Sequence, residues 1–136
     1  MNLKEALLRD EGIRLTVYND TRGIATIGVG RNLVDRGITE EEAIWLLEND
    51  ILDCEEKLIK HLEWTGEIDP PRREVLLNMI FNMGIGGLKK FQKMLVALKE
   101  RKYALAAKEM LNSLWARQVG NRAKRLAVQM ETGVRQ

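Results

Sequence analysis

The sequence predicts an α+β fold that is mainly helical, with a small β-hairpin lobe and a C-terminal helical lobe joined by a long helix. Residues 15–29 are rich in strand formers on both sides of a D-T-R-G turn. Residues 39–62 carry apolar side chains at every third or fourth position, which is typical of one long amphipathic helix. Residues 71–131 repeat the helical period in shorter segments, which predicts the helical lobe.

A chain of 136 residues, 45% of them hydrophobic, is long enough for one domain with a real core. We expect a single domain over residues 1–136, with a small mixed lobe at about 12–60. The helical lobe should comprise about 1–11 plus 61–136, and a cleft should lie between the two lobes.

The N-terminal segment predicts a helix followed by a hairpin. Apolar residues at helical spacing lead to Glu11, and Gly12 is a typical helix C-cap. In the D-T-R-G turn, Asp20 suits the first position and Gly23 the last. Residues 24–29 then form the returning strand.

Two further features connect this hairpin to the long helix. Leu33 and Val34 predict a third short strand. Thr39, followed three residues later by Glu42, predicts a capping box at the start of the long helix. Its apolar stripe should face inward and contains Ile44, Leu47, Ile51, Cys54, Leu58 and Leu62.

The remaining chain predicts four more helices. Two prolines suit the first turn of a helix that should end at Gly84. The G-I-G-G that follows predicts a flexible connection. Residues 88–99, 103–114 and 121–131 then read as three short helices. We expect all three tryptophans to serve packing.

Charge is distributed unevenly along the chain. Residues 1–70 hold 8 Lys+Arg against 16 Asp+Glu, a net of −8, whereas residues 71–136 hold 14 against 4, a net of +10. These sums give the overall +2. A basic half favours an anionic partner, which could be nucleic acid, acidic lipid or the carboxylate-rich peptides of a cell wall, although a solvated basic face without a partner is the simplest alternative.

The residue inventory argues against metal and thiol chemistry. The chain has one histidine, His61, and one cysteine, Cys54, so no zinc site and no internal disulfide are expected. These two residues lie about two helical turns apart, roughly 10 Å, which is too far for a thiolate–imidazole pair. We expect no metal and no cofactor.

Two carboxylates remain, Glu11 and Asp20. Taken singly, Glu11 is a surface acid at a helix end, where its charge opposes the helix dipole, and Asp20 is an ordinary turn residue. Together, a carboxyl at a helix end and another at a hairpin corner can face each other across a groove. Two such carboxyls are what glycoside hydrolysis requires.

The spacing E-G-x-R-L-x-x-Y-x-D-T-x-G-x-x-T-I-G-x-G resembles the catalytic signature of the phage-type lysozymes. N-M-I-F-N-M-G at 78–84 and N-R-A-K-R at 121–125 resemble two more segments of that family, in the family's order. The resemblance implies a lysozyme-like fold and hydrolysis of the β-1,4 bond between N-acetylmuramic acid and N-acetylglucosamine in peptidoglycan, with inversion. It implies that Glu11 is the general acid, that Asp20 holds the attacking water or stabilises positive charge, and that Thr26 helps to place that water.

The resemblance also implies substrate-binding residues, namely Tyr18, Leu33, Asn78, Phe81 and Arg122. From the residues alone, core packing is the default for Phe81 and an ordinary surface charge the default for Arg122; sugar contact by the Phe81 ring is what the resemblance implies. The chain departs from the best-known family member in carrying Arg31 where that member has a histidine. It is also shorter between Leu33 and Ile38, so contacts made by the missing segment do not carry over.

The expected function is therefore a monomeric muramidase that lyses bacterial cells by binding the glycan strands of peptidoglycan. Charged residues interrupt the first twelve positions, unlike the apolar core of a signal peptide or membrane span. We therefore expect synthesis in the host cytoplasm, no stable membrane association, and action on the wall after a holin-type export partner permeabilises the membrane. Two alternatives stay open: a catalytically inactive wall-binding protein, and a basic nucleic-acid-binding helical module. If the protein is a muramidase, we expect it to have no nucleic acid partner.

Overall fold

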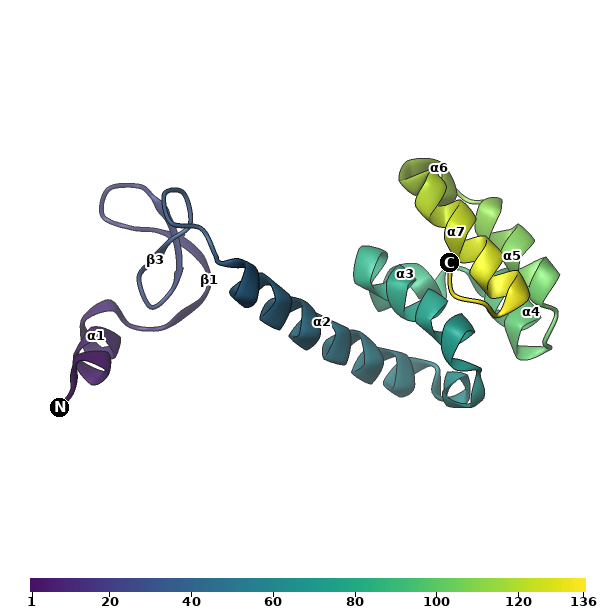
Figure 1. Ribbon diagram of the computed structural model, residues 1–136, viewed down its shortest axis with the longest axis horizontal. Helices are drawn as coiled ribbons and strands as arrows, with labels where there is room; N and C mark the ends of the chain where they lie inside the picture. Colours follow the sequence, from purple (N-terminus) through teal and green to yellow (C-terminus); the bar gives the residue numbers. More distant parts are fainter. The chain divides into compact units, whose positions relative to one another are not determined.

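The computed structural model describes residues 1–136 and confirms an α+β, predominantly helical, lysozyme-like fold (Figure 1). The chain divides into two compact units, Met1–Leu46 and Leu47–Gln136. Three strands belong to the first unit, and most helices belong to the second. In chain order the elements are α1 (Leu3–Glu11), β1 (Arg14–Asn19), β2 (Ala25–Gly28), β3 (Arg31–Asn32), α2 (Glu40–His61), a 3-10 helix (Glu63–Glu67), α3 (Pro70–Lys89), α4 (Gln92–Lys99), α5 (Tyr103–Leu111), α6 (Leu114–Val119) and α7 (Asn121–Thr132).

The first unit contains α1 and an antiparallel sheet in the order β1-β2-β3. Helix α1 begins at a capping box between Asn2 and Glu5 and ends, as predicted, at Gly12, which has a φ of 70°. The predicted third strand at residues 33–34 is wrong, because β3 comprises Arg31–Asn32. Strand β2 ends at Gly28, and a tight turn reverses the chain so early that Ile27 already pairs with Arg31.

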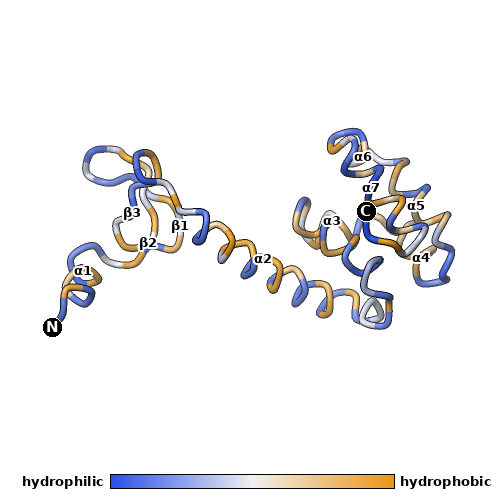
Figure 2. The backbone as a smooth tube through the Cα atoms, in the orientation of Figure 1, coloured by the Kyte–Doolittle hydropathy of each residue, from blue (hydrophilic) through white to orange (hydrophobic).

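Helix α2 crosses the boundary between the two units and begins at the predicted capping box. The Thr39 hydroxyl accepts from the Glu42 amide at 3.1 Å, and the Glu42 carboxylate accepts from the Thr39 amide at 3.0 Å. Hydrophobic and hydrophilic residues alternate along the helix (Figure 2). The predicted burial of its apolar stripe is confirmed at Cys54 and Leu58 only.

The N-terminal part of that apolar stripe is not buried, contrary to the prediction. Ile44, Leu47 and Ile51 are 49%, 39% and 41% exposed, respectively. Leu47 and Ile51 line a cavity in the second unit instead of filling its core. Trp45 is 64% exposed, so the packing role predicted for it is also wrong.

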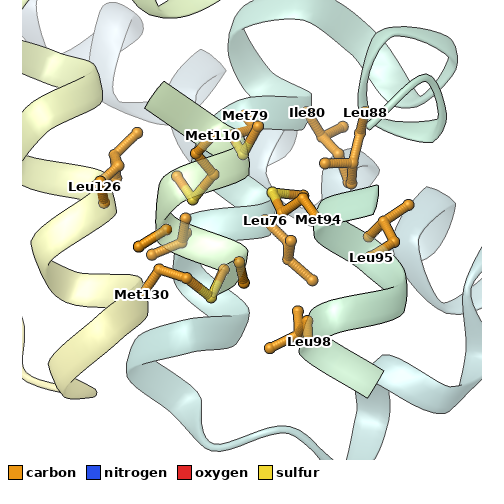
Figure 3. Close-up of a cluster of buried hydrophobic side chains, with 14 of the residues drawn as sticks. Leu76, Met79, Ile80, Leu88, Met94, Leu95, Leu98, Met110, Leu126 and Met130 are labelled. Atoms are coloured by element: carbon orange, nitrogen blue, oxygen red, sulfur yellow. The ribbon is translucent and has the colours of Figure 1, made fainter. Parts of the chain in front are cut away.

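The hydrophobic core lies in the second unit, where α3, α4, α5 and α7 contribute fully buried leucine and methionine side chains (Figure 3). The predicted packing role of Trp115 is confirmed. Its ring meets Phe91 edge-on at a centroid distance of 5.9 Å, and its indole N–H donates to the Asn82 side chain at 2.9 Å. This core fixes the helices that carry the second group of predicted site residues. Its labelled members in Figure 3 are Leu76, Met79, Ile80, Leu88, Met94, Leu95, Leu98, Met110, Leu126 and Met130.

Two helix boundaries differ from prediction. The predicted flexible G-I-G-G segment is wrong, because α3 resumes after a kink at Gly84, whose φ is 79°, and continues to Lys89. Gly87 packs so closely on Met83 that an added Cβ would lie 2.6 Å from its Cγ. The helix predicted for residues 103–114 ends at Leu111, and Ser113 caps a separate, unpredicted helix, α6, by accepting from the Ala116 amide at 3.1 Å.

Helix α1 belongs to the same compact unit as the sheet, whereas the sequence suggests that residues 1–11 belong with the helical lobe. The single-domain organisation and the assignment of residues to its lobes stay predictions. None of the helices combines the length and the apolar character needed to cross a membrane.

Candidate functional site

Asp20 lies at the corner of the β1–β2 hairpin, as the D-T-R-G pattern predicted. Its carbonyl accepts from the Gly23 amide at 2.9 Å, which closes the turn. Its side-chain Oδ1 accepts from the amides of Arg22 at 2.8 Å and Ile24 at 2.9 Å. The hydrogen bond from Ile24, reinforced by that from Arg22, lowers the pKa of Asp20 below its usual value of 3.8. Asp20 is therefore an anion at neutral pH, with Oδ1 fixed by the turn.

Thr26 lies on β2 and is only 3% exposed. Its hydroxyl donates to the Ile24 carbonyl at 2.7 Å, so the hydroxyl proton is committed while the oxygen still offers lone pairs. Tyr18 is directly opposite Thr26 in the β1–β2 register, and opposed residues of an antiparallel pair share one face. The Arg14 guanidinium lies 4.8 Å from the Tyr18 ring centroid.

Leu33 follows β3 and is anchored to the same sheet. Its amide donates to the Ala25 carbonyl at 2.9 Å, and its neighbour Asn32 pairs with Thr26. The hairpin thus brings four predicted site residues onto one small sheet: Tyr18, Asp20, Thr26 and Leu33.

Glu11 is the last residue of α1, and its exposed side chain lies against the turn between β2 and β3. A Cβ placed on Gly30 would be 2.9 Å from both Cδ and Oε2 of Glu11. Sequence reasoning placed Glu11 at a helix end but missed Gly30 as its neighbour. The available signal was the G-V-G at 28–30, which indicates close approach of backbone.

The second group of predicted site residues lies within the second unit. Arg122 donates from Nε and Nη2 to the Asn78 side-chain oxygen, at 2.9 and 2.6 Å. Both residues line a cavity of about 400 Å³ together with Phe81, which is 47% exposed. Phe81 is therefore not a core residue, and its ring is available to a ligand of this cavity. The cavity also borders Leu47, Ile51, Cys54, Glu55, Glu74 and Leu77.

Arg31, which departs from the family pattern, forms a bidentate ion pair with Glu42 of α2 at 2.9 and 2.8 Å. It also donates to the Gly37 carbonyl at 3.1 Å. The hydrogen bonds from Arg31, followed by that from the Thr39 amide, lower the pKa of Glu42 from 4.5 to about 2. This pair ties β3 to the first turn of α2.

No three side chains of the types His, Cys, Asp and Glu converge on a point where they could hold a metal ion together. The expected independence of metal and cofactor stays a prediction, as do the catalytic and binding roles of all eight site residues.

Comparison with known proteins adds an independent line of evidence. The family model described as phage lysozyme matches residues 9–130. A protein named "Probable T4-type lysozyme 2" from Dictyostelium discoideum is 32% identical over 162 residues, covering 97% of this chain and 95% of that protein. The "Endolysin" of Salmonella phage P22 is 36% identical over 86 residues, covering 57% of this chain and 58% of that protein.

The "Pre-baseplate central spike protein Gp5" of Enterobacteria phage T4 is 33% identical over 98% of this chain. The chain spans only 28% of the length of that spike protein.

Proposed function

Because the chain belongs to the phage lysozyme family, a family of glycoside hydrolases, we propose that it hydrolyses the β-1,4 bond between N-acetylmuramic acid and N-acetylglucosamine in peptidoglycan. The observation that carries the proposal is the hairpin: an ionised Asp20, fixed by two amides, on the same small sheet as the buried Thr26 hydroxyl. Lysis of bacterial cells would follow from cutting the glycan strands.

Glu11 is the proposed general acid. Its exposed position at the end of α1 leaves the carboxyl free to reach the leaving oxygen of a glycan. Donation of its proton to that oxygen accompanies cleavage of the glycosidic bond.

Asp20 and Thr26 together hold the attacking water in this proposal. The Thr26 proton is committed to the Ile24 carbonyl, so Thr26 accepts a hydrogen bond from the water instead of donating one. The second carboxylate oxygen of Asp20 accepts the water's other proton as the water oxygen attacks the anomeric carbon. A water between carboxylate and sugar requires carboxyl groups about 6.5–9.5 Å apart and gives inversion.

Substrate binding is proposed for the other five residues. An aromatic face suits the apolar side of a pyranose, and the exposed Phe81 ring borders a cavity that the hydrogen-bonded Asn78–Arg122 pair also lines. Tyr18 lies opposite Thr26 on β1, and Leu33 follows Asn32, the β3 partner of Thr26; contact of both side chains with the sugar is proposed from the resemblance to the family. The glycan strands are thus the proposed partner.

Product analysis tests this proposal. Digestion of purified peptidoglycan should yield muropeptides with N-acetylmuramic acid at the reducing end, identified by mass spectrometry. Proton NMR during the first turnovers should show the α-anomer before mutarotation. An N-acetylglucosamine reducing end would overturn the proposed bond, and an initial β-anomer would overturn the water-mediated role of Asp20 and Thr26.

The monomeric state, the holin-type partner and the lack of a nucleic acid partner stay predictions. The rival basic module predicts DNA binding that weakens steeply with salt. A gel-shift titration at two salt concentrations distinguishes it from the lysozyme, which should bind no DNA specifically.

A further inference from the structure

Two glycines frame the turn between β2 and β3, and they differ in one respect. Gly28 and Gly30 both have positive φ values, 70° and 66°, a region that disfavours any residue with a side chain. A Cβ on Gly28 would meet no atom within 4 Å. A Cβ on Gly30 would lie 2.9 Å from Cδ and Oε2 of Glu11 and 3.2 Å from its Cγ.

The turn therefore explains why both positions are glycine, but it does not explain the contact at Gly30. Glu11 comes from α1, nineteen positions earlier in the chain, and its carboxyl occupies the space that a side chain on residue 30 would fill. Gly12, directly after Glu11, leaves the helix with a φ of 70° and directs the chain into β1. The position of the Glu11 side chain is thus bounded on one side by its helix end and on the other by the bare Cα of Gly30.

We propose that Gly30 is a positioning residue for Glu11: its missing side chain provides the surface on which the Glu11 carboxyl rests. Any Cβ at this position displaces the carboxyl, because a Cβ and another heavy atom do not approach within 3.0 Å and the exposed end of the Glu11 side chain is the part that can shift. The contact itself is independent of any activity. Its consequence for turnover rests on the proposed role of Glu11 as general acid.

Proton delivery to the leaving oxygen requires hydrogen-bond reach, so displacement of the carboxyl should reduce kcat and leave KM nearly unchanged. A misplacement of about 1 Å costs on the order of 10²-fold in rate. We therefore expect Gly30→Ala to lose about 10²-fold in kcat relative to Gly28→Ala. Gly28→Ala is the matched control because it introduces the same positive-φ strain without crowding Glu11.

The experiment is a thermal unfolding cycle combined with kinetics. Gly30→Ala and Gly28→Ala are each made in the wild-type protein and in Glu11→Ala, which removes the three contacting atoms. In the wild type, Gly30→Ala should lower Tm slightly more than Gly28→Ala, because only the flexible end of the Glu11 side chain has to move. In Glu11→Ala that excess should disappear, and it should do so whether or not Glu11 is the general acid.

Each outcome decides the proposal. If the excess loss of Tm persists in Glu11→Ala, the contact with Glu11 is not what excludes a side chain, and the inference is overturned. If Gly30→Ala alone fails to fold while the double variant folds, the contact is supported; if both fail while Gly28→Ala folds, it is overturned. Equal kcat values for Gly30→Ala and Gly28→Ala would overturn the positioning role. Failure of the proposed function appears separately, as full activity of Glu11→Gln with normal Gly30.

Discussion

The two compact units are stabilised in different ways. The first unit, Met1–Leu46, contains no buried hydrophobic side chain, and its one buried residue is Thr26. Short-range hydrogen bonds define it: the capping boxes at Asn2 and Thr39, and the amides that converge on Asp20. The second unit, Leu47–Gln136, holds the entire hydrophobic core. Local polar geometry thus shapes the unit with the proposed catalytic residues, whereas apolar burial shapes the other.

The largest effect we expect comes from the first unit, where removing the acidic proton of Glu11 should abolish activity without changing stability. Glu11→Gln should reduce lysis by about 10²–10⁴-fold, because the amide keeps the shape of the side chain but cannot deliver a proton. Since Glu11 is exposed, the Tm should stay close to that of the wild type. Turbidity clearing of permeabilised Gram-negative cells measures the activity, and circular dichroism measures folding.

A neighbouring exposed acid on the same helix provides the control for this variant. Asp10→Asn removes one charge from α1 and should clear cells at the wild-type rate. Rapid clearing by folded Glu11→Gln would falsify the assignment of the general acid.

The next effect tests the apolar side of the comparison. Leu76 of α3 is fully buried, so Leu76→Ala should lower the free energy of unfolding by about 2–5 kcal/mol. Leu15 of β1 is 86% exposed, so Leu15→Ala should change the free energy of unfolding by less than about 0.5 kcal/mol. Urea unfolding followed by tryptophan fluorescence measures both. Equal losses would show that the first unit also depends on apolar burial.

The same contrast explains what could be predicted from the sequence. The Asp20 turn and the Thr39–Glu42 capping box were predicted correctly, because each depends on residue types three positions apart. Most of the apolar residues at helical spacing in α3 and α7 are buried, whereas the same spacing in α2 does not bury Ile44, Leu47 and Ile51.

The incorrect predictions concern backbone conformations and side-chain contacts that the residue types alone do not determine. The glycines after Met83 predict a flexible link, yet Gly87 is needed there because the Met83 side chain leaves no room for a Cβ. The third strand was misplaced because a tight turn after Gly28 was not foreseen. At the site, the residue types of Glu11 and Asp20 indicate acid chemistry, but nothing in the sequence pairs Glu11 with Gly30; only the folded structure shows that contact.

A smaller effect concerns Ser113, which the sequence did not mark as a helix boundary. Its hydroxyl accepts from the Ala116 amide and donates to the Met110 carbonyl at 2.7 Å. Ser113→Ala should therefore lower the free energy of unfolding by about 1 kcal/mol, whereas Ser113→Asp, which keeps the cap acceptor, should lose less. Urea titration of both variants distinguishes them, and equal losses would show that the cap at α6 is not what stabilises this boundary.

The smallest effect returns to the first unit and its Arg31–Glu42 pair, which is partly exposed to solvent. Arg31 and the Thr39 amide lower the pKa of Glu42 from 4.5 to about 2, so its contribution to stability is complete above pH 4.5. As the pH falls from 4.5 towards 2, the unfolded chain takes up the proton first and the contribution is lost.

Glu42→Gln removes this titration, so the difference in free energy of unfolding between wild type and variant should be constant above pH 4.5 and shrink steadily down to about pH 2. Urea titrations across this range measure the difference. In an Arg31→Gln background the effect of Glu42→Gln should be smaller and should change less with pH, because the first-ranking cause of the lowered pKa is absent. A difference that stays constant across the range, or that grows as the pH falls, would show that the ion pair does not hold β3 to α2, and that the first unit relies on its turns and caps alone.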